Sequence, residues 1–430
     1  PLFYDYRCFN NEILAEYIKW LSEDVKKYYP ELKVHTKIMD YYNFAWERFI
    51  LNGSDYEIMS DYTDLNGCDA FSTYPYTSYN YTKAPLELKM GWYDYMTSIK
   101  EAPVWDTESH ISNDYPIPEY DDLVPYYTSA DVWNGAIHGR GAQIIWLWDL
   151  RRGSLPGSWS NYPNANAVMR PADVVQVSKT ALDLNRLSEE VTALQKQKPE
   201  VGLLWSKTSI GYSDTYMKAN SDAYKQIIYS GQKVGFVTET KPEDMHKYKL
   251  IVIPEATHLP DNVMSELEKY EGEILIQNNN SLEYNEYNKP YDTKRISAIY
   301  SRADVTDDIR GKISEMNLSE VVLIDADTGE KCNEIEWTYT KYNNKYLVNI
   351  LNYNNKDTKK IEVFVGNRKV QSMTELRSDE MVENGILSIE PYKPQLIEFN
   401  ISTFDIIDEK GNVIKEDIGK LENGIIRYNI

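Results

Sequence analysis

Residues 103–111 read PVWDTESHI, in which a short apolar run ends in Glu108 and His110. No helix-capping pattern accounts for these polar side chains. Strands that recur about every 30 to 40 residues, each followed by a helix, indicate parallel βα units. We therefore predict four parallel strands, with Glu108 just past the end of the third. The predicted strands are residues 33–39, 68–74, 102–107 and 142–148.

Four βα units with polar residues past their strand ends match the C-terminal half of an eight-stranded (β/α)8 TIM barrel. Half a barrel cannot close, because its first strand is left as an edge with unpaired backbone groups. We therefore expect four earlier βα units in a longer protein, and the chain opens at Pro1 without a signal-like segment. The predicted half-barrel covers residues 1–197 and includes amphipathic helices at 11–29 and 171–195.

Two further domains and the start of a third are predicted after the half-barrel. Residues 198–315 alternate apolar runs with helices and predict a flavodoxin-like, non-catalytic α/β domain, in which Gly231 is placed for a left-handed turn after a helix. Residues 316–401 change to short alternating runs, with Asn343-Asn344 as a hairpin signal, and predict an antiparallel β-sandwich. Residues 402–430 resemble the start of a truncated further β module.

Composition excludes several classes of partner and cofactor. With 67 acidic and 46 basic side chains the formal charge is -21, which repels nucleic acid and anionic lipid surfaces. There is no long apolar run that predicts a membrane span. The 3 cysteines lie far apart, so they indicate neither a zinc site nor a disulfide framework. The 36 Tyr and 10 Trp suit stacking on sugar rings, although a bias in the genome explains them equally well.

Polar and aromatic side chains follow each predicted strand. In barrels of this kind catalytic groups lie at the C-terminal ends of the strands, so we expect these side chains to share one rim. The alternative for Glu108 is a solvated loop carboxylate or a partner of a helix N-cap. The side chains expected at the rim are Lys37, Tyr74, Tyr76, Glu108, His110, Trp146 and Trp148.

The chain resembles the retaining glycoside hydrolases with (β/α)8 barrels, most closely the β-galactosidases of glycoside hydrolase family 42. The order of a barrel, a flavodoxin-like domain and a small β domain is also that of the family. VHTKIM (34–39) is similar to its fifth-strand segment, usually closer to VTTNFM, and CDAFSTYPY (68–76) to its sixth-strand D-x-x-S-x-D-x-Y-P. APVWDTESH (102–110) occupies the place of the nucleophile strand, and GAQIIWLWDLRRG (141–153) that of the eighth strand.

The resemblance implies a double displacement in which Glu108 is the nucleophile. The Glu108 carboxylate has to stay ionised, so hydroxyl or cationic neighbours are expected. Trp148 would form the floor of the sugar subsite, with Tyr74, Tyr76 and Trp146 around the same pocket. Neither a cofactor nor a metal is expected, because a metal site would need His35, His110 and His138 to converge.

The acid/base carboxylate is expected immediately before Pro1. In the family a catalytic Asn-Glu pair is followed by proline, a few aromatics and a helix with a Trp-Leu pair, and PLFYDYRCF resembles that continuation. The alternative within the chain is Glu12 after Asn11. We explain Glu12 instead as a first-turn residue stabilised by capping and the helix dipole.

Four residues depart from the family pattern. Lys37 stands for the usual asparagine, Asp149 for the usual arginine, and Ser109-His110 for a glutamine pair, so a β-glycosidase of another sugar specificity fits as well as a β-galactosidase.

We expect an extracellular or cell-surface enzyme with an oligo- or polysaccharide substrate, and the resemblance implies a homotrimer formed through the middle domain. This chain alone is expected to be inactive. The rival is a non-catalytic carbohydrate-binding or scaffold protein on a degenerate barrel.

Overall fold

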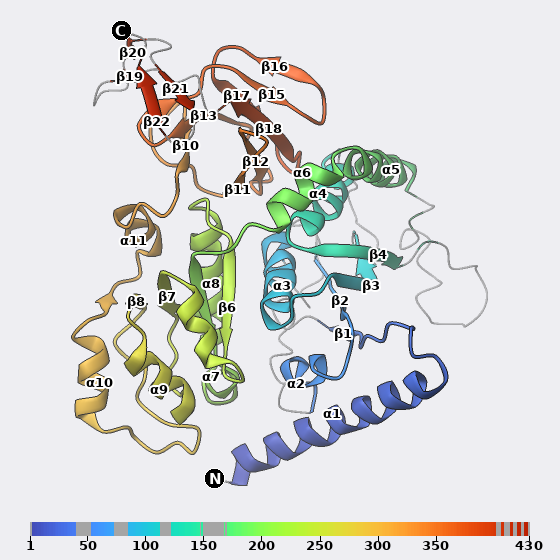
Figure 1. Ribbon diagram of the computed structural model, residues 1–430, viewed down its shortest axis with the longest axis vertical. Helices are drawn as coiled ribbons and strands as arrows, with labels where there is room; N and C mark the ends of the chain where they lie inside the picture. Colours follow the sequence, from blue (N-terminus) through green and yellow to red (C-terminus); the bar gives the residue numbers. More distant parts are fainter. Residues whose placement is uncertain are drawn as a thin grey trace.

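The chain is a mixed α/β structure with two parallel sheets and an antiparallel region (Figure 1). This fold class is the one that the sequence predicts. No helix in the described part of the chain is long and apolar enough to cross a membrane. The computed structural model describes residues 2–39, 53–72, 85–111, 122–146, 148, 167 and 170–400, and four short strands after residue 405.

The first sheet has four parallel strands in the order β1-β2-β3-β4. Helices α3 (Leu86–Ile99) and α4 (Val124–Ile137) follow β2 and β3 in the chain. Both helices bury most of their residues, because they pack on the sheet and on the rest of the molecule. The strands are β1 (Ile38–Met39), β2 (Asn66–Asp69), β3 (Val104–His110) and β4 (Arg140–Trp146).

Strand β3 is longer than the sequence predicts. It continues through Glu108 to His110, because Ser109 and His110 still pair with Ile145 and Trp146 of β4 after an irregularity in the register. Glu108 therefore lies within the last three residues of the strand rather than in a loop beyond it. Strand β1 is shorter than predicted, since only Ile38 and Met39 pair with β2.

Helix α1 (Leu2–Tyr28) begins well before the predicted start at residue 11. The prediction took Asn10 and Asn11 as caps, but Asn11 is buried and its amide donates to Asp55 Oδ2 at 3.2 Å. Glu12 consequently lies in the middle of the helix, and the explanation of Glu12 as a first-turn capping residue is wrong. Many large apolar side chains of α1 are exposed: Leu2, Phe3, Tyr6, Phe9, Ile13, Tyr17, Trp20 and Tyr28.

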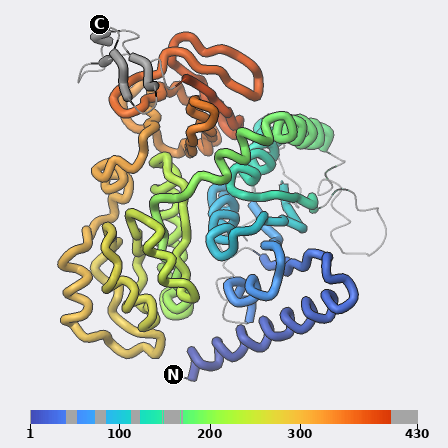
Figure 2. The backbone as a smooth tube through the Cα atoms, viewed as in Figure 1, coloured from blue at the N-terminus to red at the C-terminus, as the bar shows by residue number. Residues whose placement is uncertain are grey.

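Helix α1 also contacts the α/β region that begins at residue 201 and contains a second parallel sheet. Figure 2 shows it as one long helix that runs from beside this region to beneath the first sheet. Near its start Arg7 donates to the backbone oxygen of Lys207 at 3.1 Å.

The predicted helix at 171–195 is divided at Leu187 into α5 (Pro171–Arg186) and α6 (Ser188–Gln195).

The second sheet is parallel and has the strand order β6-β5-β7-β8-β9. This is the flavodoxin-like order 2-1-3-4-5. Gly231 has φ +71°, which confirms the left-handed turn predicted after α8 (Tyr216–Ile228). The strands are β5 (Val201–Trp205), β6 (Val234–Thr238), β7 (Leu250–Ile253), β8 (Glu273–Ile276) and β9 (Asp304–Val305). The remaining helices are α2 (Tyr56–Ser60), α7 (Lys207–Tyr212), η5 (Pro242–Lys247), α9 (Asp261–Lys269), α10 (Thr293–Tyr300) and α11 (Ile309–Glu315).

Two antiparallel sheets enclose a separate apolar core. One has the order β11-β12-β18-β15-β16, and in the other β13 pairs with β10, β14 and β17. Asn343 and Asn344 have φ 50° and 61°, as the predicted two-residue hairpin requires. The strands are β10 (Val321–Asp325), β11 (Ile335–Tyr342), β12 (Lys345–Asn352), β13 (Lys359–Val365), β14 (Arg368–Lys369), β15 (Met373–Glu375), β16 (Glu380–Val382), β17 (Ile386–Ile389) and β18 (Gln395–Asn400).

Beyond residue 405, β19 (Ile406–Ile407) pairs with β20 (Val413–Lys415), and β21 (Gly419–Glu422) with β22 (Ile425–Tyr428), both antiparallel.

A buried ionic network joins α4 to the antiparallel region. His138 follows α4, with Nδ1 2.9 Å from Asp94 Oδ2 and Nε2 2.6 Å from Glu336 Oε1 of β11. Asn134 and Tyr353 also donate to Glu336, at 2.9 and 2.5 Å. Burial alone lowers the pKa of His138, but the two carboxylates outweigh it and raise the pKa to about 10. The buried imidazole is therefore held as a cation.

The network predicts how stability depends on pH. Because the folded-state pKa of His138 lies above its value of 6.5 in an unfolded chain, the stabilisation is complete below pH 6.5 and is lost as pH rises toward 10. The midpoint of thermal unfolding should fall between pH 6.5 and 10, and the fall should be smaller in His138→Gln. The control His246→Gln removes a partly exposed histidine and should keep the full fall. An equal fall in His138→Gln and in the unmodified protein would contradict this assignment.

Candidate functional site

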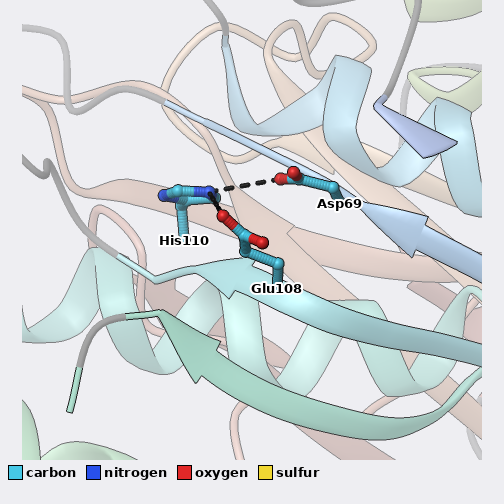
Figure 3. A group of neighbouring side chains, drawn as sticks. All are labelled: Asp69, Glu108 and His110. Atoms are coloured by element: carbon cyan, nitrogen blue, oxygen red, sulfur yellow. Dashed lines mark hydrogen bonds and ion pairs between the residues drawn. The ribbon is translucent and has the colours of Figure 1, made fainter. Parts of the chain in front are cut away.

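Three neighbouring strands bring four polar side chains together at one edge of the first sheet. Glu108 and His110 are two residues apart on β3 and so share a face of the sheet, and Asp69 ends the neighbouring strand β2. Lys37 directly precedes β1. Figure 3 shows the side chains of Asp69, Glu108 and His110 pointing toward one another.

The polar atoms of this cluster lie within direct contact of each other. His110 Nε2 is 3.2 Å from Asp69 Oδ1 and 3.9 Å from Glu108 Oε1. Lys37 Nζ donates to Glu108 Oε2 and lies 3.6 Å from Asp69 Oδ2. The Lys37 ammonium group thus contacts one oxygen of each carboxylate. The His110 imidazole faces the other oxygen of each.

The carboxylates around Lys37 hold its ammonium group in the charged form. Burial alone lowers the pKa of Lys37, but the hydrogen bond to Glu108 and the charge of Asp69 outweigh it, and the pKa is raised. The side chain of Lys37 is 42% exposed and that of Glu108 19% exposed. The carboxylate of Glu108 is therefore accessible from solvent and has a cationic neighbour.

A buried network holds the end of β3 in place. Lys89 of α3 and Asp131 of α4 form a fully buried ion pair, with Nζ 2.7 Å from Oδ2. Lys89 also donates to the backbone oxygen of His110 at 3.0 Å and to Ser109 Oγ at 3.3 Å. Gln143 of β4 donates to Ser109 Oγ at 2.9 Å. The two residues that directly follow Glu108 are thus held by Lys89 of α3 and Gln143 of β4.

Two predicted aromatic residues lie at or just beyond the end of β4. Trp146 and Trp148 are 44% and 48% exposed, and the rings of Trp146 and His110 are 6.4 Å apart. The ring of Phe71, which the sequence did not single out, lies 5.2 Å from that of His110. The predicted Tyr74 and Tyr76, and Asp149, lie outside the described residues.

Sequence reasoning missed Asp69, Lys89 and Asp131. Asp69 stands inside the quoted segment CDAFSTYPY, but the predicted strand 68–74 places it near the start of that strand, whereas β2 ends at Asp69. Lys89 is a charged residue in a mostly apolar helix segment, which is a signal for a buried ion pair. The sequence around Lys89 gives no indication that Asp131 is its partner.

The three histidines of the first sheet region do not share a site. His138 is bound by Asp94 and Glu336, and His35 lies beside Trp105 with ring centroids 6.0 Å apart. The expectation that no metal could be held rested on these histidines. The donor atoms of Asp69, Glu108 and His110 nevertheless lie within 4.8 Å of one another, as a metal site requires. Lys37 Nζ contacts both of these carboxylates and competes for them.

The comparisons with known proteins give structural relatives alone. No protein-family model and no curated protein matches the sequence. The apo exo-carrageenase GH42 of Bacteroides ovatus has a TM-score of 0.75 at 22% identity over 93% of this chain. Gan42B, a GH42 β-galactosidase of G. stearothermophilus, has a TM-score of 0.70 at 13% identity over 93% of this chain. The β-galactosidase of Bacillus circulans sp. alkalophilus has a TM-score of 0.63 at 12% identity over 92% of this chain.

These similarities confirm the expected resemblance to family 42 glycoside hydrolases at the level of the fold. The chain covers 56% of the length of the exo-carrageenase, 68% of that of Gan42B and 67% of that of the Bacillus enzyme. It therefore spans little more than half of the first of these proteins.

The position of Lys37 predicts a change in metal binding. Without its ammonium, Asp69, Glu108 and His110 would retain two carboxylates and an imidazole with no cation between them. We expect Lys37→Ala to bind Zn²⁺ at least about tenfold more tightly than the unmodified protein at pH 7, as measured by calorimetry. The control Lys33→Ala removes an exposed lysine and should not change Zn²⁺ affinity. Equal Zn²⁺ affinity in Lys37→Ala and the unmodified protein would show that Lys37 does not occupy this position.

Proposed function

We propose that this chain is part of a retaining glycoside hydrolase that acts on β-galactosides or related β-glycosides. One observation carries the proposal: the Glu108 carboxylate is presented at the C-terminal end of a parallel strand, contacted by Lys37 and two residues from His110, whose ring lies 6.4 Å from that of the exposed Trp146. The fold similarity to family 42 enzymes supports the same reading.

The proposed architecture is the C-terminal half of a (β/α)8 barrel in residues 1–197, preceded by four further βα units. Within the described residues β1 and β4 each have a single neighbouring strand, and the exposed apolar side chains of α1 need a cover. The flavodoxin-like domain would cover 198–315, the β-sandwich 316–401 and the start of a further β module 402–430.

The proposed reaction is a double displacement at the anomeric carbon. A Glu108 oxygen forms a bond to that carbon while the bond to the leaving oxygen breaks, and a second carboxyl group donates its proton to the leaving group. That second group then takes a proton from water, and the water oxygen replaces Glu108. We place the second group just upstream of Pro1, because PLFYDYRCF resembles the stretch that follows the catalytic Asn-Glu pair in family 42. A retaining enzyme would hold that group roughly 5 to 5.5 Å from Glu108.

In this mechanism Lys37 places a positive charge beside Glu108 and fixes which of its oxygens is free. Oε2 accepts from Lys37, so Oε1 is the oxygen that would attack. His110 lies 3.9 Å from that oxygen and can orient it. The sugar would rest on Trp148, with Trp146, Tyr74 and Tyr76 around it.

The exo-carrageenase among the similar structures is a reason to include carrageenan oligosaccharides in the substrate panel. An extracellular or cell-surface location and a trimer formed through the middle domain are further parts of the proposal.

A non-catalytic carbohydrate-binding protein is the second candidate. It is favoured by the direct contact of Lys37 with Glu108, because a carboxylate bound to an ammonium group is a weaker nucleophile. The two candidates differ in whether any glycoside is hydrolysed.

The central test is Glu108→Gln in the complete protein that contains this chain. With a panel of aryl β-glycosides we expect kcat/KM to fall by roughly 10³-fold or more, because the amide cannot form the covalent intermediate. Glu12→Gln is the matched control, since it makes the same change on the exposed side of α1 and should leave the rate within about twofold. Equal rates for Glu108→Gln and the unmodified protein would remove Glu108 from the mechanism, and a loss in Glu12→Gln would restore Glu12 as the acid.

A further inference from the structure

A cavity lies away from the Glu108 site, between the end of α8, helix α11 and the sheet that contains β10 and β13. Its volume is about 540 Å³, within the range of roughly 300 to 1,000 Å³ usual for small-molecule sites. Figure 1 shows these elements on the side of the molecule away from β3. The residues that decide its chemistry are Tyr229, Arg310, Val322, Ile324, Lys331 and Phe364.

The floor of the cavity is an apolar sheet face. Val322 of β10 and Phe364 of β13 are cross-strand partners, and Ile324 is two residues along β10 on the same face. Val321 and Leu323 alternate with them and belong to the core between the two antiparallel sheets. The sheet therefore carries three apolar side chains on the face away from the core, beside Glu362, which pairs with Lys369.

The wall of the cavity carries two cations with neutral partners. Arg310 donates to Asn333 Oδ1 and, at 2.7 Å, to the backbone oxygen of Cys332. Lys331 donates to Ser314 Oγ at 2.6 Å. Neither side chain forms an ion pair within the part of the chain that the structure describes, and no Asp or Glu lines the cavity.

Arg310 and Lys331 have more N–H donors than the contacts above use. A guanidinium has five N–H groups and an ammonium three, and the contacts above use only part of them. Burial lowers the pKa of Arg310 by more than the nearby charge of Asp308 raises it, so the guanidinium is partly desolvated without full compensation. Holding α11 against residues 331–333 would need hydrogen bonds but no charge. The charges are explained if an anion completes the site.

We propose that this cavity binds a small anionic saccharide, with its sulfate or carboxylate on Arg310 and Lys331 and the apolar face of its ring on Phe364 and Ile324. The saccharide part rests on the proposed function, whereas the anion part rests on the cavity alone. The site would hold charged substrate or product on the enzyme at a distance from Glu108.

Calorimetry with galactose 6-sulfate, galactose and inorganic sulfate tests the proposal, in a Glu108→Gln background so that no turnover interferes. We expect galactose 6-sulfate to bind at least about tenfold more tightly than either galactose or sulfate. Arg310→Gln/Lys331→Gln should weaken the binding of galactose 6-sulfate by about tenfold or more for each charge removed. Lys198→Gln/Lys356→Gln is the matched control, because it removes two exposed lysines outside the cavity and should bind as the background does.

Folding is checked by the midpoint of thermal unfolding, and Lys331→Gln alone, at an exposed position, repeats the test with the Arg310 contacts to Cys332 and Asn333 left in place. Equal affinity for sulfate and galactose 6-sulfate would overturn the saccharide part, and equal affinity of the cavity and control variants would overturn the whole proposal. Both results are independent of whether Glu108 is the nucleophile, since that is decided by hydrolysis rates.

Discussion

The ammonium group of Lys37 is the contact on which the site depends. Neighbouring strands lie about 4.8 Å apart, so the ends of β2 and β3 necessarily bring Asp69 and Glu108 close together. Their donor atoms and that of His110 lie within 4.8 Å of one another. Two carboxylates at this separation repel each other unless a cation lies between them. Lys37 supplies that cation and leaves one oxygen of Glu108 available for chemistry.

The rigidity of the site comes from groups behind the sheet. The buried pair of Lys89 and Asp131 ties the backbone of His110 to α3 and α4. A buried ion pair of this kind adds little net stability, but the loss of one partner leaves an uncompensated charge. The pair therefore specifies one position for the end of β3. His138 does the same between α4 and β11, and Lys207 between α2 and α7, where its Nζ is 2.7 Å from Asp55 Oδ2.

Much of the fold follows from the spacing of apolar runs, while the contacts within the site do not. The βα spacing predicts that Glu108 and Lys37 share an edge, because the carboxyl ends of parallel strands meet there. The predicted end of β3 was wrong, because the pairing of β3 with β4 continues through polar residues, which no hydrophobic pattern marks. The start of α1 was also wrong, because Asn11 is bound by Asp55, which is distant in the sequence, and does not cap a helix. Asp131 and Glu336 were missed for the same reason: their partners come from other elements.

The most direct measurement is covalent trapping of the nucleophile. Incubation of the complete protein with an activated 2-deoxy-2-fluoro-β-galactoside slows release of the glycosyl group, and digestion followed by mass spectrometry locates that group. The account predicts one glycosyl group per chain, on the peptide that contains Glu108. A glycosyl group on any other carboxylate, or hydrolysis of the parent galactoside without any trapped peptide, would contradict it.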